Sequence, residues 1–101
     1  MSYPELKTFE RPMQRLIDAA RELGYDFTPE LKKWDHCLRI KEWMQYKYNI
    51  YTWVIPHSNF TFTPYYKDLR NPTTRPKKFA FSEYYNQAFI EGLLYALDEI
   101  K

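Results

Sequence analysis

Two histidines and one cysteine are the side chains of this chain that are best suited to hold a metal or to carry a nucleophilic reaction. His36 and Cys37 are adjacent, and His57 follows about twenty residues later. A zinc site usually needs four ligands in closely spaced pairs, and no second pair is present. Neighbouring helix residues point apart, so His36 cannot act as the base for a Cys37 nucleophile. We interpret His36 as a surface residue beside a buried Cys37 and expect no metal site.

Other patterns typical of catalysis are equally weak. The acids Asp98 and Glu99 fall on the expected solvent face of the last helix, where they add solubility. The only glycines are Gly24 and Gly92, so the chain has no glycine-rich phosphate loop. An enzyme would need titratable groups that converge from distant parts of the chain, which this sequence does not display. We therefore expect a protein without catalytic residues and without a cofactor.

The strongest binding pattern is a basic segment, residues 67–78, which follows two tyrosines. It carries a formal charge of +4, whereas the rest of the chain sums to −2. Cations can neutralise phosphates, and exposed aromatic rings can stack on bases. The candidate nucleic-acid-binding residues are Tyr65, Tyr66, Lys67, Arg70, Arg75, Lys77 and Lys78. We favour a solvated connecting loop, with nucleic acid and an acidic protein partner as the alternatives.

The composition fits one small globular domain over residues 1–101. Charged residues make up 28% and apolar residues 45% of the chain, and aromatic residues reach 20%, with ten tyrosines. Most of these rings are expected in the core, but a domain of this size cannot hide all of them. Cys37 is the only cysteine, so no internal disulfide can form, which is typical of a reducing compartment. The chain has no apolar run that fits a signal peptide or a membrane span, and we expect a cytoplasmic protein.

Two helices are expected in the first half of the chain. The first carries an apolar stripe and ends at Gly24, a residue type that favours helix ends. The stripe consists of Met13, Leu16, Ile17, Ala20 and Leu23. The second helix is expected to begin at Thr28-Pro29-Glu30, with threonine as the cap, and a break near Asp35 is left open. It is expected to end at Asn49, because asparagine tolerates left-handed backbone.

The middle of the chain is expected to form an antiparallel sheet. Ile50–Ile55 is rich in β-branched and aromatic residues and predicts the first strand, which a turn follows. Phe60–Tyr66 alternates Phe and Thr and predicts the second strand. Pro64 lacks a backbone N–H, which favours an edge position for this strand. After a loop that contains two X-Pro steps, residues 77–81 predict a short third strand.

The chain closes with a helix that we expect over residues 82–101. Ser82 is suited to cap its start. An apolar stripe recurs at helical spacing through Tyr85, Ala88, Phe89, Gly92, Leu93, Ala96, Leu97 and Ile100. A glycine inside a helix costs about 1 kcal/mol relative to alanine. Gly92 therefore indicates that this helix closely approaches a sheet or another helix.

These elements predict a single small α+β domain in the order α-α-β-β-(β)-α, with helices packed on a short antiparallel sheet. Three segments resemble a group of small uncharacterised proteins found in phages and phage-like elements of gut-type bacteria. The segments are Ala19–Phe27, Trp43–Ile50 leading into the strand, and the Tyr-Tyr pair with the stripe from Ala88 to Leu97. The resemblance implies this fold and an origin in a mobile element, and it implies no activity.

From these features we expect a protein that works by contact with an unidentified protein partner or with a second copy of itself. The excess of aromatic residues and the edge-like strand Phe60–Tyr66 favour this function, because an exposed strand edge can pair with another chain. The alternative is a nucleic-acid-binding module that uses residues 67–78.

Overall fold

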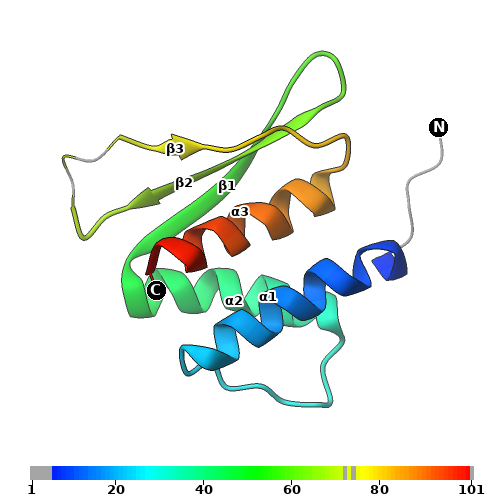
Figure 1. Cartoon of the computed structure of the whole chain (residues 1–101), viewed down its shortest axis with the longest axis vertical. Coiled ribbons are helices and arrows are strands. Elements are labelled where there is room, and N and C mark those ends of the chain that lie inside the picture. The colour runs from blue at the N-terminus through cyan, green and yellow to red at the C-terminus, as the bar shows by residue number, and fades with distance from the viewer. Residues whose placement is uncertain (1–5, 72, 74, 101) are drawn as a thin grey trace.

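The computed structural model describes residues 6–71, 73 and 75–100. Their elements follow the order α-α-β-β-β-α after a short 3-10 helix, so the chain is a small α+β domain (Figure 1). The elements are η1 (Leu6–Phe9), α1 (Glu10–Glu22), α2 (Lys33–Tyr48), β1 (Ile50–Pro56), β2 (Phe62–Asp68), β3 (Lys77–Lys78) and α3 (Tyr85–Ile100).

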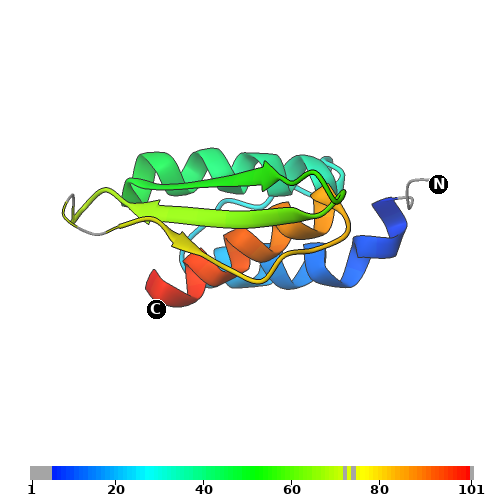
Figure 2. The same cartoon turned by 90° about the horizontal axis from the view of Figure 1, so that it is seen from above.

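The helices lie on one side of a three-stranded antiparallel sheet, whose strand order is β1-β2-β3. α3 runs along the sheet and contacts β1 and β2, and α1 packs against α3 and α2. Figure 2 looks onto the other face of the sheet, where no helix of the described residues lies over the strands. The molecule is thin, with principal extents of 40 × 36 × 17 Å. One face of the sheet is therefore packed and the other is open.

The first helix follows its sequence pattern. α1 buries Met13, Leu16, Ile17 and Ala20. Gly24 follows the helix with a φ of +100°, the left-handed region where glycine has no steric penalty. The chain then turns back, and the N–H of Tyr25 donates to the carbonyl of Ala20 at 3.0 Å.

The second helix begins later than its sequence predicts. Thr28 does not cap it, because α2 starts at Lys33 after an extended Lys32. The Thr28 carbonyl instead accepts from the N–H of Leu31 at 3.4 Å in a turn. α2 then continues without a break through Asp35. Its predicted end is confirmed, because Asn49 adopts a φ of 55° and ψ of 39°.

The second strand lies at the centre of the sheet, so the edge position predicted for Phe60–Tyr66 is wrong. Phe62 and Ser82 exchange two backbone hydrogen bonds of 2.8 Å, and the Pro64 carbonyl accepts from the N–H of Phe79 at 3.0 Å. The backbone groups of Pro64 therefore face the β3 side, and so does the position where its N–H is missing.

A bulge accommodates this proline in a central strand. On β2, two residues separate the paired positions Phe62 and Tyr65, whereas three residues separate their partners Ser82 and Lys78. The extra residue lies where Pro64 has no hydrogen to donate. The regular pairing of β3 is therefore confined to Lys77 and Lys78, shorter than the predicted strand over residues 77–81.

The last helix packs on the sheet through most of its predicted stripe, although Tyr85 of the stripe is 47% exposed and Ile90, outside the stripe, is fully buried. Its buried residues are Ala88, Phe89, Ile90, Gly92, Leu93, Ala96 and Leu97. A Cβ placed on Gly92 would lie 3.0 Å from the Cβ of Pro64, closer than ordinary contact, so the glycine permits the close approach of helix and sheet. The helix begins at Tyr85, and Ser82 precedes it with its hydroxyl accepting from the N–H of Tyr84 at 3.2 Å.

Candidate functional site

The two tyrosines of the predicted nucleic-acid-binding set lie on opposite faces of β2, because neighbouring strand residues point in opposite directions. Tyr66 is only 4% exposed and stacks on Phe79, with ring centroids 5.6 Å apart and planes at 8°. A buried ring offers no face to a base, so Tyr66 leaves the candidate set. Tyr65 lies on the open side of the sheet and stays in it.

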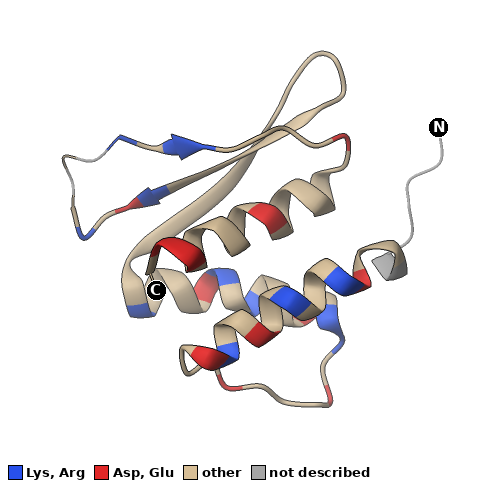
Figure 3. Cartoon of the chain, in the orientation of Figure 1, with Lys and Arg blue, Asp and Glu red and all other residues tan. Residues whose placement is uncertain are grey.

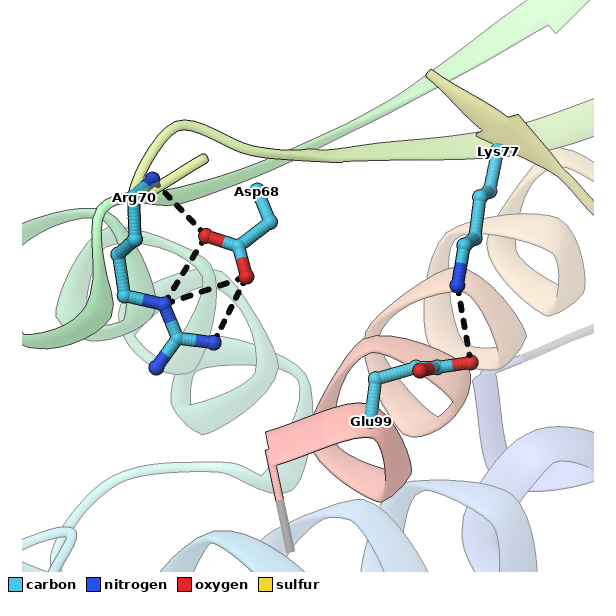
Figure 4. Close-up of polar contacts among 4 residues, drawn as sticks. All are labelled: Asp68, Arg70, Lys77 and Glu99. Carbon is cyan, nitrogen blue, oxygen red and sulfur yellow. Dashed lines mark hydrogen bonds and ion pairs between the residues drawn. The ribbon is translucent and has the colours of Figure 1, made fainter. Parts of the chain in front are cut away.

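Two of the basic residues in the set are engaged by acids (Figure 4). Arg70 donates from Nη2 to Oδ2 of Asp68 at 2.7 Å and from Nε to Oδ1 at 2.9 Å. These bonds lower the pKa of Asp68 and raise the pKa of Arg70. Lys77 Nζ lies 3.4 Å from Oε1 of Glu99 on α3. A phosphate at either cation would have to compete with the negative charge of a carboxylate that is already beside it.

The other basic residues of the set are Lys67, Arg75 and Lys78. Among the described residues, no ion pair involves Lys67, Arg75 or Lys78. Arg75 is exposed in the connection before β3. Figure 3 shows the basic residues at the end of β2, in this connection and on β3, while the acids of α3 lie below the sheet.

Seven side chains form the face of the sheet that α3 does not cover, and we call this surface the open face. They are Tyr51, Trp53 and Ile55 from β1, Thr63, Tyr65 and Lys67 from β2, and Lys78 from β3. Their assignment follows from the strand alternation, because Ile50, Thr52, Pro64 and Tyr66 are the positions between them that point to the helix side. Six of the seven are at least partly exposed, whereas Thr63 is only 7% exposed and has its hydroxyl 2.6 Å from His57 Nε2. The open face holds two cations and no acid.

The strand register brings the aromatic and basic residues of the open face side by side. Trp53 lies opposite Tyr65, and their rings stack with centroids 5.7 Å apart and planes at 8°. Tyr51 lies opposite Lys67, and Tyr65 lies opposite Lys78. Sequence reasoning missed Tyr51 and Trp53. The alternation along β1 separates its two faces, but it does not tell which face the helix covers.

The histidine beside the cysteine is buried, so its interpretation as a surface residue is wrong. The Tyr25 hydroxyl lies 2.7 Å from His36 Nδ1, and His36 Nε2 lies 2.7 Å from the Thr28 carbonyl. A carbonyl only accepts, so Nε2 carries the hydrogen and Nδ1 accepts from Tyr25. Phe27 stacks on the imidazole at 4.5 Å. Both ring nitrogens of His36 are hydrogen-bonded, so this side chain of α2 holds the preceding linker, which contains Tyr25 and Thr28, against the helix.

Cys37 is buried, as expected, and burial raises the pKa of its thiol to about 12. The reactive form of a cysteine is the thiolate. At a pH far below the pKa of the thiol, very little thiolate is present. We expect iodoacetamide to leave the native protein unmodified at mildly alkaline pH and to label Cys37 fully in denaturant, as measured by mass spectrometry. Rapid labelling without denaturant would contradict the buried position.

Further polar groups of the described residues include His57 and the ion pair of Glu10 with Lys33. In the part of the chain that the structure describes, no group of three or more His, Cys, Asp and Glu side chains could hold a metal ion. His57 lies near the hairpin and has its Nε2 at 2.6 Å from the Thr63 hydroxyl. A shallow depression beside Glu10 and Lys33 is bridged by their own ion pair of 2.8 Å.

Comparison of the chain with protein-family models, with curated proteins and with solved structures found no match. None of the described helices combines the length and apolarity needed to cross a membrane. We therefore base the proposals for this chain on its own sequence and structure.

Proposed function

We propose that this chain is a cytoplasmic, non-enzymatic protein of a phage-like element that acts by protein–protein contact, and that the contact includes self-association through β1. The observation that carries the proposal is the position of β1 at the edge of the sheet. An unpaired strand edge presents a row of backbone donors and acceptors to another chain. The single buried Cys37 and the resemblance of three segments support the cytoplasmic location and the origin.

The outward backbone groups of β1 can be identified from its neighbours. Asn49 and His57 flank the strand, and both bond to the β2 side, at 2.9 and 2.8 Å. Backbone direction alternates from residue to residue, so odd positions face β2 and even positions face away. Thr52 and Val54 therefore direct their N–H and C=O groups toward the unpaired edge. Val54 is half-buried and Thr52 is only 6% exposed, so Val54 is the more accessible of the two.

The two edges of the sheet differ in how well they are protected. β1 has seven residues without a charge, and its one proline, Pro56, stands at the end. β3 has two residues, and both are exposed lysines. Short edge strands and lysines are common devices that prevent unwanted pairing, whereas a long uncharged edge favours it. Pairing is therefore expected at β1.

A second copy can pair with β1 in an antiparallel, twofold-symmetric register. A twofold axis through Trp53, the midpoint of the strand, places all seven residues of the two copies opposite each other. Thr52 and Val54 then exchange hydrogen bonds with Val54 and Thr52 of the second copy. The two copies of Trp53 come side by side on the open face. β1 itself has no charged residue, so no like charges meet between the two paired strands.

Sedimentation equilibrium tests the self-association. The wild-type chain is expected to form dimers at micromolar concentrations. Val54→Pro removes an outward N–H that makes no bond within the sheet, and it should weaken the dimer by about tenfold or more because two symmetry-related bonds are lost. Val54→Ala shortens the same side chain but keeps the N–H, and it serves as the matched control.

Two results would contradict this proposal. If the wild-type chain stays monomeric well above micromolar concentration, the proposed self-association does not occur. A dimer that Val54→Pro and Val54→Ala affect equally would show that the contact uses another surface. Circular dichroism of each variant establishes that it keeps the native helix content before its association is measured.

A further inference from the structure

We propose that the open face of the sheet binds single-stranded nucleic acid, with Trp53 and Tyr65 as the stacking platform and with Lys67 and Lys78 as the phosphate contacts. This site goes beyond the proposed function, because it needs neither a dimer nor the edge of β1. It also differs from the site predicted from the sequence, since Tyr66, Arg70 and Lys77 have partners within the domain.

The aromatic pair provides surface for bases. Trp53 and Tyr65 stack on each other, so each ring keeps one face outside the pair, and both side chains are only half-buried. Tyr51 extends the row along β1 and is 39% exposed. Stacking on aromatic side chains tolerates every base, because every base has a π-face. The platform therefore predicts binding with little sequence preference.

The charges of the open face complement a phosphate backbone. Lys67 lies beside Tyr51, and Lys78 lies beside Tyr65, so a cation flanks each end of the aromatic row. Neither lysine pairs with an acid of the described residues. The acids of α3 lie on the other side of the sheet (Figure 3). A strand that crosses the open face thus meets cations and rings together.

The spacing of the rings favours a single strand over a duplex. Tyr51 and Trp53 are two positions apart on β1, which places them about 7 Å apart along the strand. Neighbouring bases within one strand of a duplex are about 3.4 Å apart. Rings at the wider spacing suit bases that have been unstacked and splayed, which only a single strand presents. An acidic peptide would use the lysines but would leave the rings without a role.

Fluorescence anisotropy with labelled oligo-dT and oligo-rU at low salt tests the site. The Lys67→Ser, Lys78→Ser double variant should weaken binding and should flatten the dependence of log K on log salt by about 1.4, since each lost phosphate contact contributes about 0.7. Arg70→Ser with Lys77→Ser is the matched control, because it removes the same charge from residues that are already paired. The control is expected to change binding little.

The aromatic contribution is measured separately with Trp53→Leu, which keeps an apolar side chain on the open face. We expect a loss of roughly ten- to hundredfold in affinity, the range found when one stacking ring is removed. The Val54→Pro variant should bind normally, because the site lies within one copy of the chain. This result separates the nucleic-acid site from the self-association.

Several outcomes would overturn the site. One is a failure of both oligonucleotides to bind at low salt. Another is a loss of affinity in the Arg70→Ser, Lys77→Ser control as large as that in the Lys67→Ser, Lys78→Ser variant. Equal affinity for a duplex of the same length would exclude the stacking platform. Equal binding of poly-glutamate, with no loss on Trp53→Leu, would show that the lysines recognise acidic protein instead.

Discussion

Gly92→Leu is expected to destabilise the domain by about 3 kcal/mol or more, and it is the largest effect we expect from a single substitution. A Cβ at this position would already lie 3.0 Å from the Cβ of Pro64, and the further atoms of leucine would have to enter the contact between α3 and β2. Overpacking a filled contact typically costs about 1–3 kcal/mol, and more where backbone has to move. Denaturant midpoints measure the change.

Gly92→Ala separates helix propensity from packing at the same site. Alanine gains about 1 kcal/mol of helix propensity over glycine. The tight approach to Pro64 opposes that gain, so the net effect should be near zero or destabilising. In a Pro64→Gly background the opposing Cβ is gone, and Gly92→Ala should become more favourable than in the wild type.

Asp98→Leu is the control for bulk on the same helix, because Asp98 is exposed. It places a leucine on the solvent side of α3 and should change stability by less than about 0.5 kcal/mol. A clear stabilisation by Gly92→Ala, with Gly92→Leu tolerated, would contradict the packing of this helix face on β2.

The parts of the fold that the sequence predicts have local causes. Gly24 and Asn49 end their helices because each adopts the left-handed backbone that their types tolerate. The stripes of α1 and α3 repeat at the helical period, so they identify buried faces without knowledge of what covers them. Gly92 adds a packing inference, because a glycine inside a helix needs a compensating close contact.

The parts that the sequence does not predict depend on pairing. Pro64 indicates an edge strand only if a residue with an N–H at that position would donate a hydrogen bond to a neighbouring strand. Here it falls at a bulge, and a bulge depends on the partner strand. The start of α2 also differs from its predicted position. Thr28 has the residue type of a cap, but the chain uses its carbonyl to hold His36.

In the candidate site, too, local features are predictable from the sequence, and contacts between distant residues are not. The basic composition of residues 67–78 is visible in the sequence, and the pair of Arg70 with Asp68 is nearly local. The pair of Lys77 with Glu99 joins residues far apart in the chain, and the sequence gives no sign of it. The open face depends on which side of β1 and β2 receives α3. Both faces carry aromatic residues, so residue type alone does not distinguish them.

His36→Phe is expected to destabilise the domain by about 2–4 kcal/mol, although it conserves ring shape and approximate volume. The substitution leaves the buried Tyr25 hydroxyl without the acceptor that now lies 2.7 Å away, and the Thr28 carbonyl loses its 2.7 Å partner and keeps only the longer bond of 3.4 Å from the N–H of Leu31. An unsatisfied buried polar group costs about 1–3 kcal/mol. Desolvation raises the pKa of Tyr25, so its hydroxyl is protonated and able to donate at neutral pH. Urea denaturation provides the measurement.

A double-mutant cycle tests whether the polar contact, rather than ring packing, causes this loss. Tyr25→Phe alone leaves His36 Nδ1 without its donor and should cost about 1–3 kcal/mol. The double variant Tyr25→Phe, His36→Phe removes both partners of that bond, so its cost should be smaller than the sum of the single costs. Tyr46→Phe removes a hydroxyl from a side chain that is 89% exposed and should have no measurable effect. Strict additivity, or a His36→Phe variant as stable as the wild type, would show that the linker before α2 is held by apolar packing alone.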